Sequence, residues 1–254
     1  MAKIISLVNQ KGGVGKSTSA VNLGGYLAAL GRYVLLVDID PQANATSGIG
    51  LNSQKVFRGL YHSLIDNVSS EETIHKTNLL GYDVIPASSD LAGATIELVN
   101  MPNREFKLYE VLRRIRTDYD YILIDCPPSL GLLTVNGLVA ADEVIIPVQC
   151  EYYALEGLGQ LLKTIELVQD NLDSPIKIKG ALLTMYDRRN RLSRQVRKEV
   201  ERNFNDYVFE SIIPRCVKLA EAPSFGKSIF QYAPHSRGAK AYQKLAQEII
   251  NLEK

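Results

Sequence analysis

Between an apolar run at residues 3–9 and a segment of helical periodicity at residues 17–30 lies a glycine-rich loop, and few folds contain this arrangement. The loop reads NQKGGVGKST at residues 9–18. Glycines at such a junction allow backbone N–H groups to surround phosphate oxygens, and the first turn of the following helix adds partial positive charge. The loop therefore predicts a strand–loop–helix unit that holds the phosphates of a nucleotide.

The end of this loop suggests roles for two side chains. Gly15, Lys16 and Ser17 match the close of the pattern G-x-x-x-x-G-K-[ST]. In that pattern the lysine contacts the β- and γ-phosphates and the hydroxyl binds Mg²⁺. The first glycine of the pattern falls on Gln10, so the spacing departs from the usual one there. A glycine-rich turn with a chance lysine is the alternative interpretation, but the order of strand, loop and helix favours nucleotide binding.

Lys11 is a second lysine in the same loop, which is more than one nucleotide within one chain requires. One interpretation is a solvated surface cation. The other is a lysine that reaches the triphosphate of a neighbouring subunit and offsets charge in the transition state, as an arginine finger does.

Two apolar runs end in aspartate. Residues 33–38 end at Asp38 and continue to Asp40, and residues 121–125 end at Asp125. A carboxylate that ends a buried strand beside a phosphate loop suits the coordination shell of Mg²⁺, which favours Asp125. Asp40 lies where the chain leaves its strand, and it is expected to position the attacking water. The alternative is that Asp38 or Asp125 only caps the following turn.

Apolar, strand-like runs alternate with helical segments along most of the chain. The predicted strands are residues 3–9, 33–38, 121–125, 143–148 and 178–184. The predicted helices are residues 17–30, 108–116, 155–170, 192–204 and 239–251. Consecutive apolar residues in the strands are typical of a sheet covered by helices on both faces. The alternation predicts an α/β fold with a doubly wound, mostly parallel sheet, and residues 1–254 are expected to form a single domain.

Charge is sorted along the chain although the net charge is only +1. Residues 186–254 hold 14 Lys or Arg and 8 Asp or Glu, whereas residues 1–185 hold 15 and 20. Many of these cations crowd one stretch: Arg188, Arg189, Arg191, Arg194, Arg197, Lys198 and Arg202. A solvated helix face is one interpretation. A surface that binds the phosphates of duplex DNA is favoured, because six of these cations precede the first glutamate and no aromatic residue lies among them to stack on bases.

The composition argues against several classes of protein. Cys126, Cys150 and Cys216 are widely spaced and form no CxxC pair, so neither a disulfide framework nor a zinc or iron–sulfur site is expected. No apolar run approaches the roughly 18 residues of a membrane span. The first residues do not resemble a signal peptide. We therefore expect a cytoplasmic protein.

Taken together, the motifs resemble the deviant Walker ATPases, a group of P-loop NTPases, and specifically the ParA/Soj partition ATPases. The motifs are KGGVGKS at residues 11–17, LLVDIDPQANATS at 35–47, ILIDCPPSLGLLT at 122–134, PVQCEYYALEGL at 147–158, LLTMYD at 182–187 and IPRCVKLAEAPSFGKSI at 213–229. The resemblance covers nearly the whole chain. Ser17 and Ala43 stand where relatives more often have Thr and Gly, and neither difference removes a required group.

The resemblance implies a chromosome or plasmid segregation ATPase that uses ATP and Mg²⁺ and forms a homodimer with ATP held between the subunits. Hydrolysis to ADP and phosphate would be weak until a ParB-type partner protein stimulates it. Lys11, Lys16 and Asp40 would be catalytic, and Ser17, Asp40 and Asp125 would hold the metal. The nucleotide contacts would come from Lys11, Gly12, Gly13, Val14, Gly15, Lys16, Ser17, Thr18, Met185, Pro214, Arg215 and Val217.

The resemblance also implies binding of double-stranded DNA without sequence preference, and hence association with the nucleoid. The residues expected to contact DNA are Arg188, Arg189 and Lys218. Lys218 stands where relatives often have Arg, so it keeps the charge but lacks the planar fork, which favours phosphate contact over base recognition.

Three other functions fit the sequence less well. A MinD-like ATPase at the membrane surface needs an amphipathic C-terminal helix with a basic polar face. Residues 239–251 have an apolar stripe, but the charges near it are mixed in sign, so packing onto the domain is the simpler interpretation. A nitrogenase-type reductase or iron–sulfur carrier needs bridging cysteines, and this chain lacks a convincing set of them. A regulator with its own helix-turn-helix needs room before the first strand, which begins near Lys3.

Overall fold

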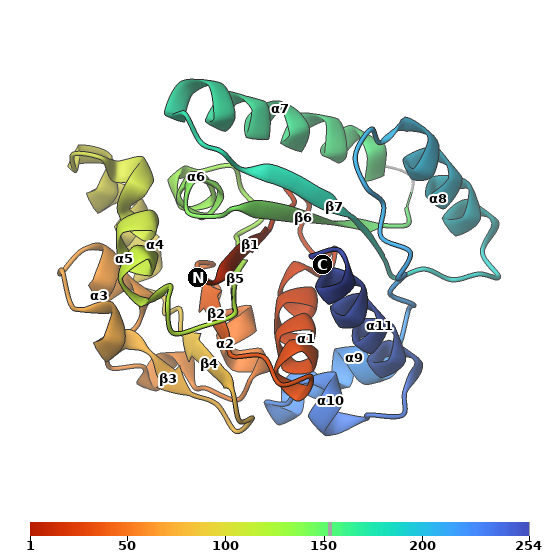
Figure 1. Ribbon diagram of the computed structural model, residues 1–254, viewed down its shortest axis with the longest axis horizontal. Coiled ribbons are helices and arrows are strands. Elements are labelled where there is room, and N and C mark those ends of the chain that lie inside the picture. Colours follow the sequence, from red (N-terminus) through yellow and green to blue (C-terminus); the bar gives the residue numbers. More distant parts are fainter. Residues whose placement is uncertain (152–153, 254) are drawn as a thin grey trace.

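A computed structural model describes residues 1–151 and 154–253, and its centre is a seven-stranded sheet in the order β3-β4-β2-β5-β1-β6-β7 (Figure 1). The strands are β1 (Lys3–Leu7), β2 (Val34–Asp38), β3 (His75–Lys76), β4 (Tyr82–Ile85), β5 (Tyr121–Asp125), β6 (Glu143–Gln149) and β7 (Lys177–Thr184). All neighbouring pairs in this sheet are parallel except β3 and β4. The predicted mostly parallel α/β sheet is confirmed.

Helices cover both faces of the sheet. They are α1 (Lys16–Ala29), α2 (Asn44–Gly48), α3 (Leu60–Leu64), α4 (Leu91–Glu97), α5 (Lys107–Ile115), α6 (Leu132–Val139), α7 (Ala154–Leu172), α8 (Arg191–Asn203), α9 (Val217–Glu221), α10 (Ile229–Tyr232) and α11 (Arg237–Asn251). One apolar core lies between the sheet and the helices α1, α9, α10 and α11. A second core lies between the opposite face and α3 to α8. The doubly wound arrangement is therefore confirmed, because apolar side chains on alternate strand positions supply both cores.

The predicted elements are present, with differences at their ends. The strand predicted at residues 3–9 ends at Leu7, because the next residues turn into the glycine-rich loop. The two outer strands β3 and β4 and the short helices α2, α3, α4, α6, α9 and α10 were not predicted. These elements have two to eight residues, which is too short for a hydrophobic period to be recognised.

The C-terminal helix α11 packs along α1, the helix that follows the glycine-rich loop. Its apolar stripe is buried, and it consists of Tyr242, Leu245, Ala246, Ile249 and Ile250. The hydroxyl of Tyr242 lies 2.9 Å from that of Ser19 in α1, within hydrogen-bonding distance. Packing onto the domain, the simpler interpretation of this stripe, is confirmed.

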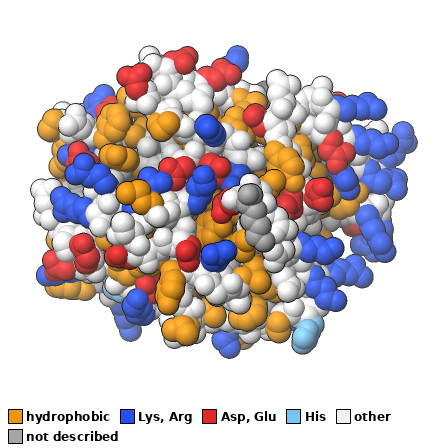
Figure 2. Space-filling view, in the orientation of Figure 1, with side chains coloured by type: hydrophobic (Ala, Val, Ile, Leu, Met, Phe, Trp, Pro, Cys, Tyr) orange, Lys and Arg blue, Asp and Glu red, His pale blue; other side chains and the backbone are white. Residues whose placement is uncertain are grey.

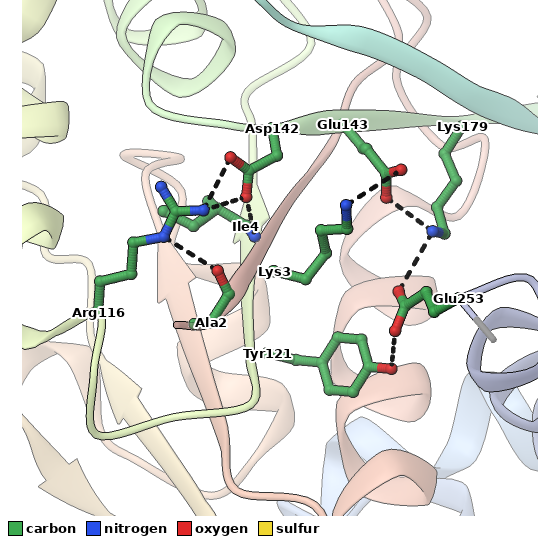
Figure 3. A network of polar contacts seen from close by, with 9 residues as sticks. All are labelled: Ala2, Lys3, Ile4, Arg116, Tyr121, Asp142, Glu143, Lys179 and Glu253. Carbon is green, nitrogen blue, oxygen red and sulfur yellow. Dashed lines mark hydrogen bonds and ion pairs between the residues drawn. The ribbon is translucent and has the colours of Figure 1, made fainter.

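The amino ends of the strands are closed by a network of charged side chains (Figure 3). Arg116, just after α5, donates to both carboxylate oxygens of Asp142 at 2.6 and 2.8 Å and to the carbonyl of Ala2 at 3.0 Å. Asp142 in turn accepts from the backbone N–H of Ile4 at 2.9 Å.

A second branch joins Lys179 to Glu143 and Glu253, and Glu253 also accepts from the hydroxyl of Tyr121. The network joins the starts of β1, β5, β6 and β7 to Glu253, just after α11, at the end of the sheet opposite the glycine-rich loop.

Replacing Arg116 with methionine is expected to lower the free energy of unfolding by about 1–3 kcal/mol, because charge-assisted bonds to Asp142 are lost. For a chain of this size, each kcal/mol corresponds to roughly 2–4 °C in the midpoint of thermal unfolding. Arg113→Met, at an exposed position of α5 just before Arg116, is the matched control. Equal melting temperatures for the two variants would show that the network adds nothing to stability.

Candidate functional site

The glycine-rich loop leaves the carboxyl end of β1 and enters α1 at Lys16. Gly13 and Gly15 have φ angles of 74° and 90°, a left-handed backbone that a residue with a Cβ rarely adopts. Val14 between them is buried, and its carbonyl accepts a hydrogen bond from the hydroxyl of Thr184 at the end of β7. The loop is therefore attached to the sheet at Val14, while Gly12 and Gly13 are exposed to solvent.

Lys16 begins α1 and is only 6% exposed. Burial lowers the pKa of its ammonium group, and the negative charges of Asp125 and Asp40 act in the opposite direction. Its Nζ lies 3.4 Å from the carbonyl of Lys11, which is a long hydrogen bond. A buried cation with few partners of its own is suited to receive phosphate oxygens.

Asp38 and Asp125 end neighbouring strands and are directly paired in the sheet register. Both are fully buried, but their surroundings differ. Asp38 accepts hydrogen bonds from Asp40 and Thr46, and burial raises its pKa to about 6 despite these bonds. Neither oxygen of Asp125 completes a hydrogen bond with a described residue, although the hydroxyl of Ser17 lies nearby. Burial, and secondly the charge of Asp38, raise the pKa of Asp125 well above its usual value.

An unsatisfied buried carboxylate needs an explanation, and a hydrated cation supplies one. Mg²⁺ keeps several waters and binds one or two carboxylates together with substrate phosphates. Asp125 and Ser17 beside the phosphate loop fit that arrangement. The part of the chain that the structure describes contains no cluster of three or more His, Cys, Asp or Glu side chains placed to hold a metal directly. The residues therefore suit a cation that the nucleotide brings with it, rather than a metal held by protein ligands alone.

A cavity of about 430 Å³ lies in front of the glycine-rich loop. Its lining includes the predicted residues Gly12, Gly13, Gly15, Lys16, Ser17, Thr18, Asp40 and Met185. Asp40 is 6% exposed, and its Oδ1 accepts from the backbone N–H of Gln42. The structure thus brings the glycine-rich loop and Asp40 to one cavity. Asp125, at the end of the central strand β5, is not part of this lining.

Sequence reasoning did not single out five polar or ring-bearing residues of this lining. They are Asn22, Gln42, Asn44, Pro223 and Lys227. Gln42 and Asn44 lie within the motif that contains Asp40, so their place near the site was available from that motif. Asn22 and Lys227 come from segments far apart in sequence, and only the packing of α1 against the chain before α10 brings them together.

A second cavity of about 360 Å³ adjoins the first and shares Gly15, Thr18 and Met185 with it. Pro214, Arg215 and Val217, three further predicted nucleotide contacts, line it together with Thr184 and Tyr242, whereas the predicted contact Val14 lines neither cavity. Met185 has a φ angle of 50°, an uncommon conformation for a residue with a long side chain. The lining of this second cavity is more apolar than polar, which suits a flat aromatic base next to a candidate phosphate site.

Lys11 is half-exposed, and its Nζ lies 3.4 Å from the Oε2 of Glu151. Glu151 also accepts from the side-chain amide of Gln149 at 2.6 Å. Lys11 does not line either cavity. Its side chain is therefore paired with a carboxylate of its own chain and is not directed into either cavity. The motif predicted at residues 147–158 continues after Glu151, but residues 152–153 lie outside the described part.

The predicted DNA contacts fall into two places. Arg188 and Arg189 follow β7, and they line a surface hollow of about 710 Å³ together with Arg215 and Arg237. Arg189 is 87% exposed at its side chain and forms an ion pair with Asp187. Lys218 does not line this hollow. It pairs with Glu221 and lies 5.7 Å from the centre of the Tyr232 ring.

Beside the hollow, α8 presents a stripe of exposed cations at helical spacing: Arg191, Arg194, Lys198 and Arg202. None of these four forms an ion pair with a described side chain. The opposite face of α8 buries Ser193, Val196 and Val200. Figure 2 shows the resulting concentration of Lys and Arg at the right-hand side of the molecule, where α8 lies in Figure 1.

Within the described residues, no helix is both long enough and apolar enough to cross a membrane.

Comparison with known proteins identifies the family. Residues 2–179 match the family described as an AAA domain. The chain is 55% identical to the sporulation initiation inhibitor protein Soj of Bacillus subtilis, covering 98% of both chains. It is 51% identical to the chromosome partitioning protein ParA of Myxococcus xanthus, covering 98% of this chain and 88% of the relative.

A solved structure supports the same conclusion. The cobyrinic acid a,c-diamide synthase from Mycobacterium smegmatis, with bound ATP analogue and magnesium, is 37% identical with a TM-score of 0.87. The similarity covers 99% of this chain and 95% of that one. The glycine-rich loop, the two aspartates at the strand ends and these relatives lead to one conclusion: the chain belongs to the ParA/Soj family of chromosome-partitioning ATPases.

Proposed function

We propose that this protein is an ATPase of chromosome or plasmid segregation that binds duplex DNA without sequence preference when ATP has joined two copies of it. Residues 1–254 act as one ATPase domain in this proposal. ATP binds with its phosphates at the loop around Lys16 and its base in the cavity near Met185, and Mg²⁺ binds beside Ser17 and Asp125. A ParB-type partner protein stimulates hydrolysis, and DNA binding places the dimer on the nucleoid.

The nucleotide part of the proposal is supported by the buried groups of the site. Lys16 is a buried cation and Asp125 is a buried carboxylate without hydrogen-bond partners among the described residues. A triphosphate with Mg²⁺ supplies anionic oxygens to the first and a hydrated cation to the second. Asp40 borders the same cavity and is placed to orient a water molecule toward the terminal phosphate.

One observation carries the link between ATP and DNA. Pro214, Arg215 and Val217 line both the cavity assigned to the base and the arginine hollow that contains Arg188 and Arg189. A nucleotide whose base lies in the base cavity therefore contacts the same backbone segment that forms a wall of the arginine hollow. Because weak sites on two copies add their free energies when the copies are joined, dimerisation with ATP increases the apparent affinity for DNA.

The alternative, a MinD-like ATPase at the membrane surface, requires the apolar face of a terminal helix to be available to lipid. The apolar stripe of α11 is covered by the domain core. The covered stripe therefore favours DNA over a lipid membrane as the partner of this protein. Sedimentation with lipid vesicles in the presence of ATP is the direct measurement, and co-sedimentation would favour the membrane alternative.

The DNA surface is tested by Arg189→Glu. With ATP and Mg²⁺ at low salt, affinity for a random-sequence duplex is expected to fall at least about tenfold, because an exposed cation near phosphates becomes an anion. In the unaltered protein the affinity should also fall steeply with salt and should be lower with ADP or no nucleotide. Fluorescence anisotropy with labelled duplex measures all of these.

The matched control for this experiment is Arg113→Glu, an exposed position on α5 at the other side of the molecule, which gives the same change in net charge. It should leave DNA affinity near that of the unaltered protein. ATP affinity should be unchanged in both variants. An Arg189→Glu variant that binds duplex as tightly as Arg113→Glu would remove Arg189 from the proposed DNA surface.

A further inference from the structure

A buried chain of hydrogen bonds connects Asp40 to a neighbouring strand through Asp38 and Thr46. The carboxylate of Asp38 accepts from the backbone N–H of Asp40 at 3.2 Å. Its other oxygen accepts from both the backbone N–H and the hydroxyl of Thr46, each at 2.8 Å. Asp38 and Thr46 are both fully buried. Both carboxylate oxygens of Asp38 thus accept hydrogen bonds from residues that follow it, whereas those of Asp125 accept none from the described residues.

The hydroxyl of Thr46 continues the chain beyond Asp38. It accepts a hydrogen bond from the backbone N–H of Ala87 at 2.9 Å, just after β4. A hydroxyl has one proton to donate and two lone pairs to accept, so Thr46 donates its proton to Asp38 and accepts from Ala87 at the same time. Thr46 is the residue that joins the start of the loop at Asp38 to the neighbouring strand β4.

The loop between Asp38 and α2 needs such an attachment. Ala43 within it has a φ angle of 52°, an unfavourable conformation that persists only where the surroundings impose it. Asp40 contributes one bond within the loop, from its Oδ1 to the N–H of Gln42. The end of α2 is fixed separately by the close approach of Gly50 and Gly226, where a Cβ on Gly50 would lie 2.8 Å from the carbonyl of Gly226.

We propose that Thr46 is a positioning residue for ATP hydrolysis: its side chain holds Asp38, and through Asp38 it fixes the backbone of Asp40 at the edge of the phosphate cavity. This inference rests on the proposed function, in which Asp40 orients the attacking water. Thr46 itself does not line the cavity. Substitution of Thr46 therefore leaves the proposed phosphate contacts of Lys16 in place. It lowers the rate of the chemical step, because displacing a reacting group by about 1 Å can cost up to ~10²-fold in rate.

The test compares Thr46→Val, which keeps the shape but loses the hydroxyl, with Thr46→Ser, which keeps the hydroxyl. With Mg²⁺ and ATP, kcat of Thr46→Val is expected to fall about tenfold or more while the affinity for ATP stays within about twofold. Thr46→Ser should recover most of kcat. Equal kcat for Thr46→Val and the unaltered protein, or a loss in both variants, would overturn the positioning role.

Thr73→Val is the matched control for lost stability. Thr73 is also fully buried, and its hydroxyl bonds to the carbonyl of Ser70 and lies within bonding distance of the Ser63 hydroxyl, outside the cavity lining. It should lower the melting temperature similarly without lowering kcat. A matching drop in kcat for Thr73→Val would show that the effect at Thr46 is only general destabilisation.

Hydrogen exchange provides a readout that does not depend on turnover. In Thr46→Val the backbone amides of Asp40 and Ala87 should exchange faster than in the unaltered protein, while amides within α1 keep their protection. Unchanged exchange at both amides overturns the inference even if kcat falls. An unaltered protein that binds no ATP would instead contradict the proposed function, and the exchange result would still decide whether Thr46 fixes this loop.

Discussion

Replacing Lys11 with alanine is expected to lower the rate of ATP hydrolysis by a factor of about 10³, by comparison with a charge supplied in trans by an arginine finger. The affinity for ATP should change little, because Lys16 and the loop backbone hold the phosphates and Lys11 lines neither cavity. The pair of Lys11 with Glu151 is exposed on both sides, and such pairs contribute only about 0–1 kcal/mol. Lys11 is therefore easily released to a second copy of the chain.

A mixing experiment decides whether Lys11 acts across the proposed dimer. Lys11→Ala and Asp40→Ala should each be nearly inactive alone. In a mixed dimer, the site of the Lys11→Ala subunit keeps its own Asp40 and receives Lys11 from the other subunit, so mixing should restore hydrolysis. If Lys11 acted within its own chain, no site in the mixed dimer would hold both residues, and the mixture would stay inactive. Sizing with ATP confirms that the variants still associate.

The candidate nucleotide site could be located from sequence because it is built from local patterns. The loop around Lys16 and the aspartates at the ends of two strands are each defined within a few residues, and parallel strands place those ends together. Thr46 could not be found in this way. Its partners Asp38 and Ala87 are 8 and 41 residues away, and only the order of the strands brings them together.

The basic surface was predictable in composition but not in arrangement. The sequence shows that cations gather after residue 186, and the structure places them around a hollow and along one face of α8. Two of the three expected DNA contacts, Arg189 and Lys218, pair with Asp187 and Glu221. Sequence neighbours cannot reveal which of them share a surface, because this depends on how residues 208–214 run beside β7 and the residues that follow it.

Replacing Asp125 with asparagine is the second change with a large expected effect. Its effect on the free energy of unfolding depends on whether Mg²⁺ and ATP are bound. Without nucleotide, Asp125→Asn is expected to raise the free energy of unfolding by about 1–3 kcal/mol, because a buried carboxylate with no hydrogen-bond partner among the described residues is removed. With Mg²⁺ and ATP the variant should gain less stability than the unaltered protein and hydrolyse ATP far more slowly, because the support for the cation is lost. Thermal unfolding with and without Mg²⁺ and ATP measures both effects.

The stabilising effect of Asp125→Asn should also grow with pH. The pKa of Asp125 is raised in the folded protein, so above the usual carboxyl pKa the folded state retains a proton that the unfolded chain has released. The free energy of unfolding of the unaltered protein then decreases as pH rises toward the raised pKa, and the asparagine variant lacks this contribution. Asp38→Asn is the contrasting control: Asp38 accepts three hydrogen bonds, so its replacement should destabilise the protein. Stabilisation by Asp38→Asn, or destabilisation by Asp125→Asn, would show that hydrogen bonding does not distinguish these two buried carboxylates.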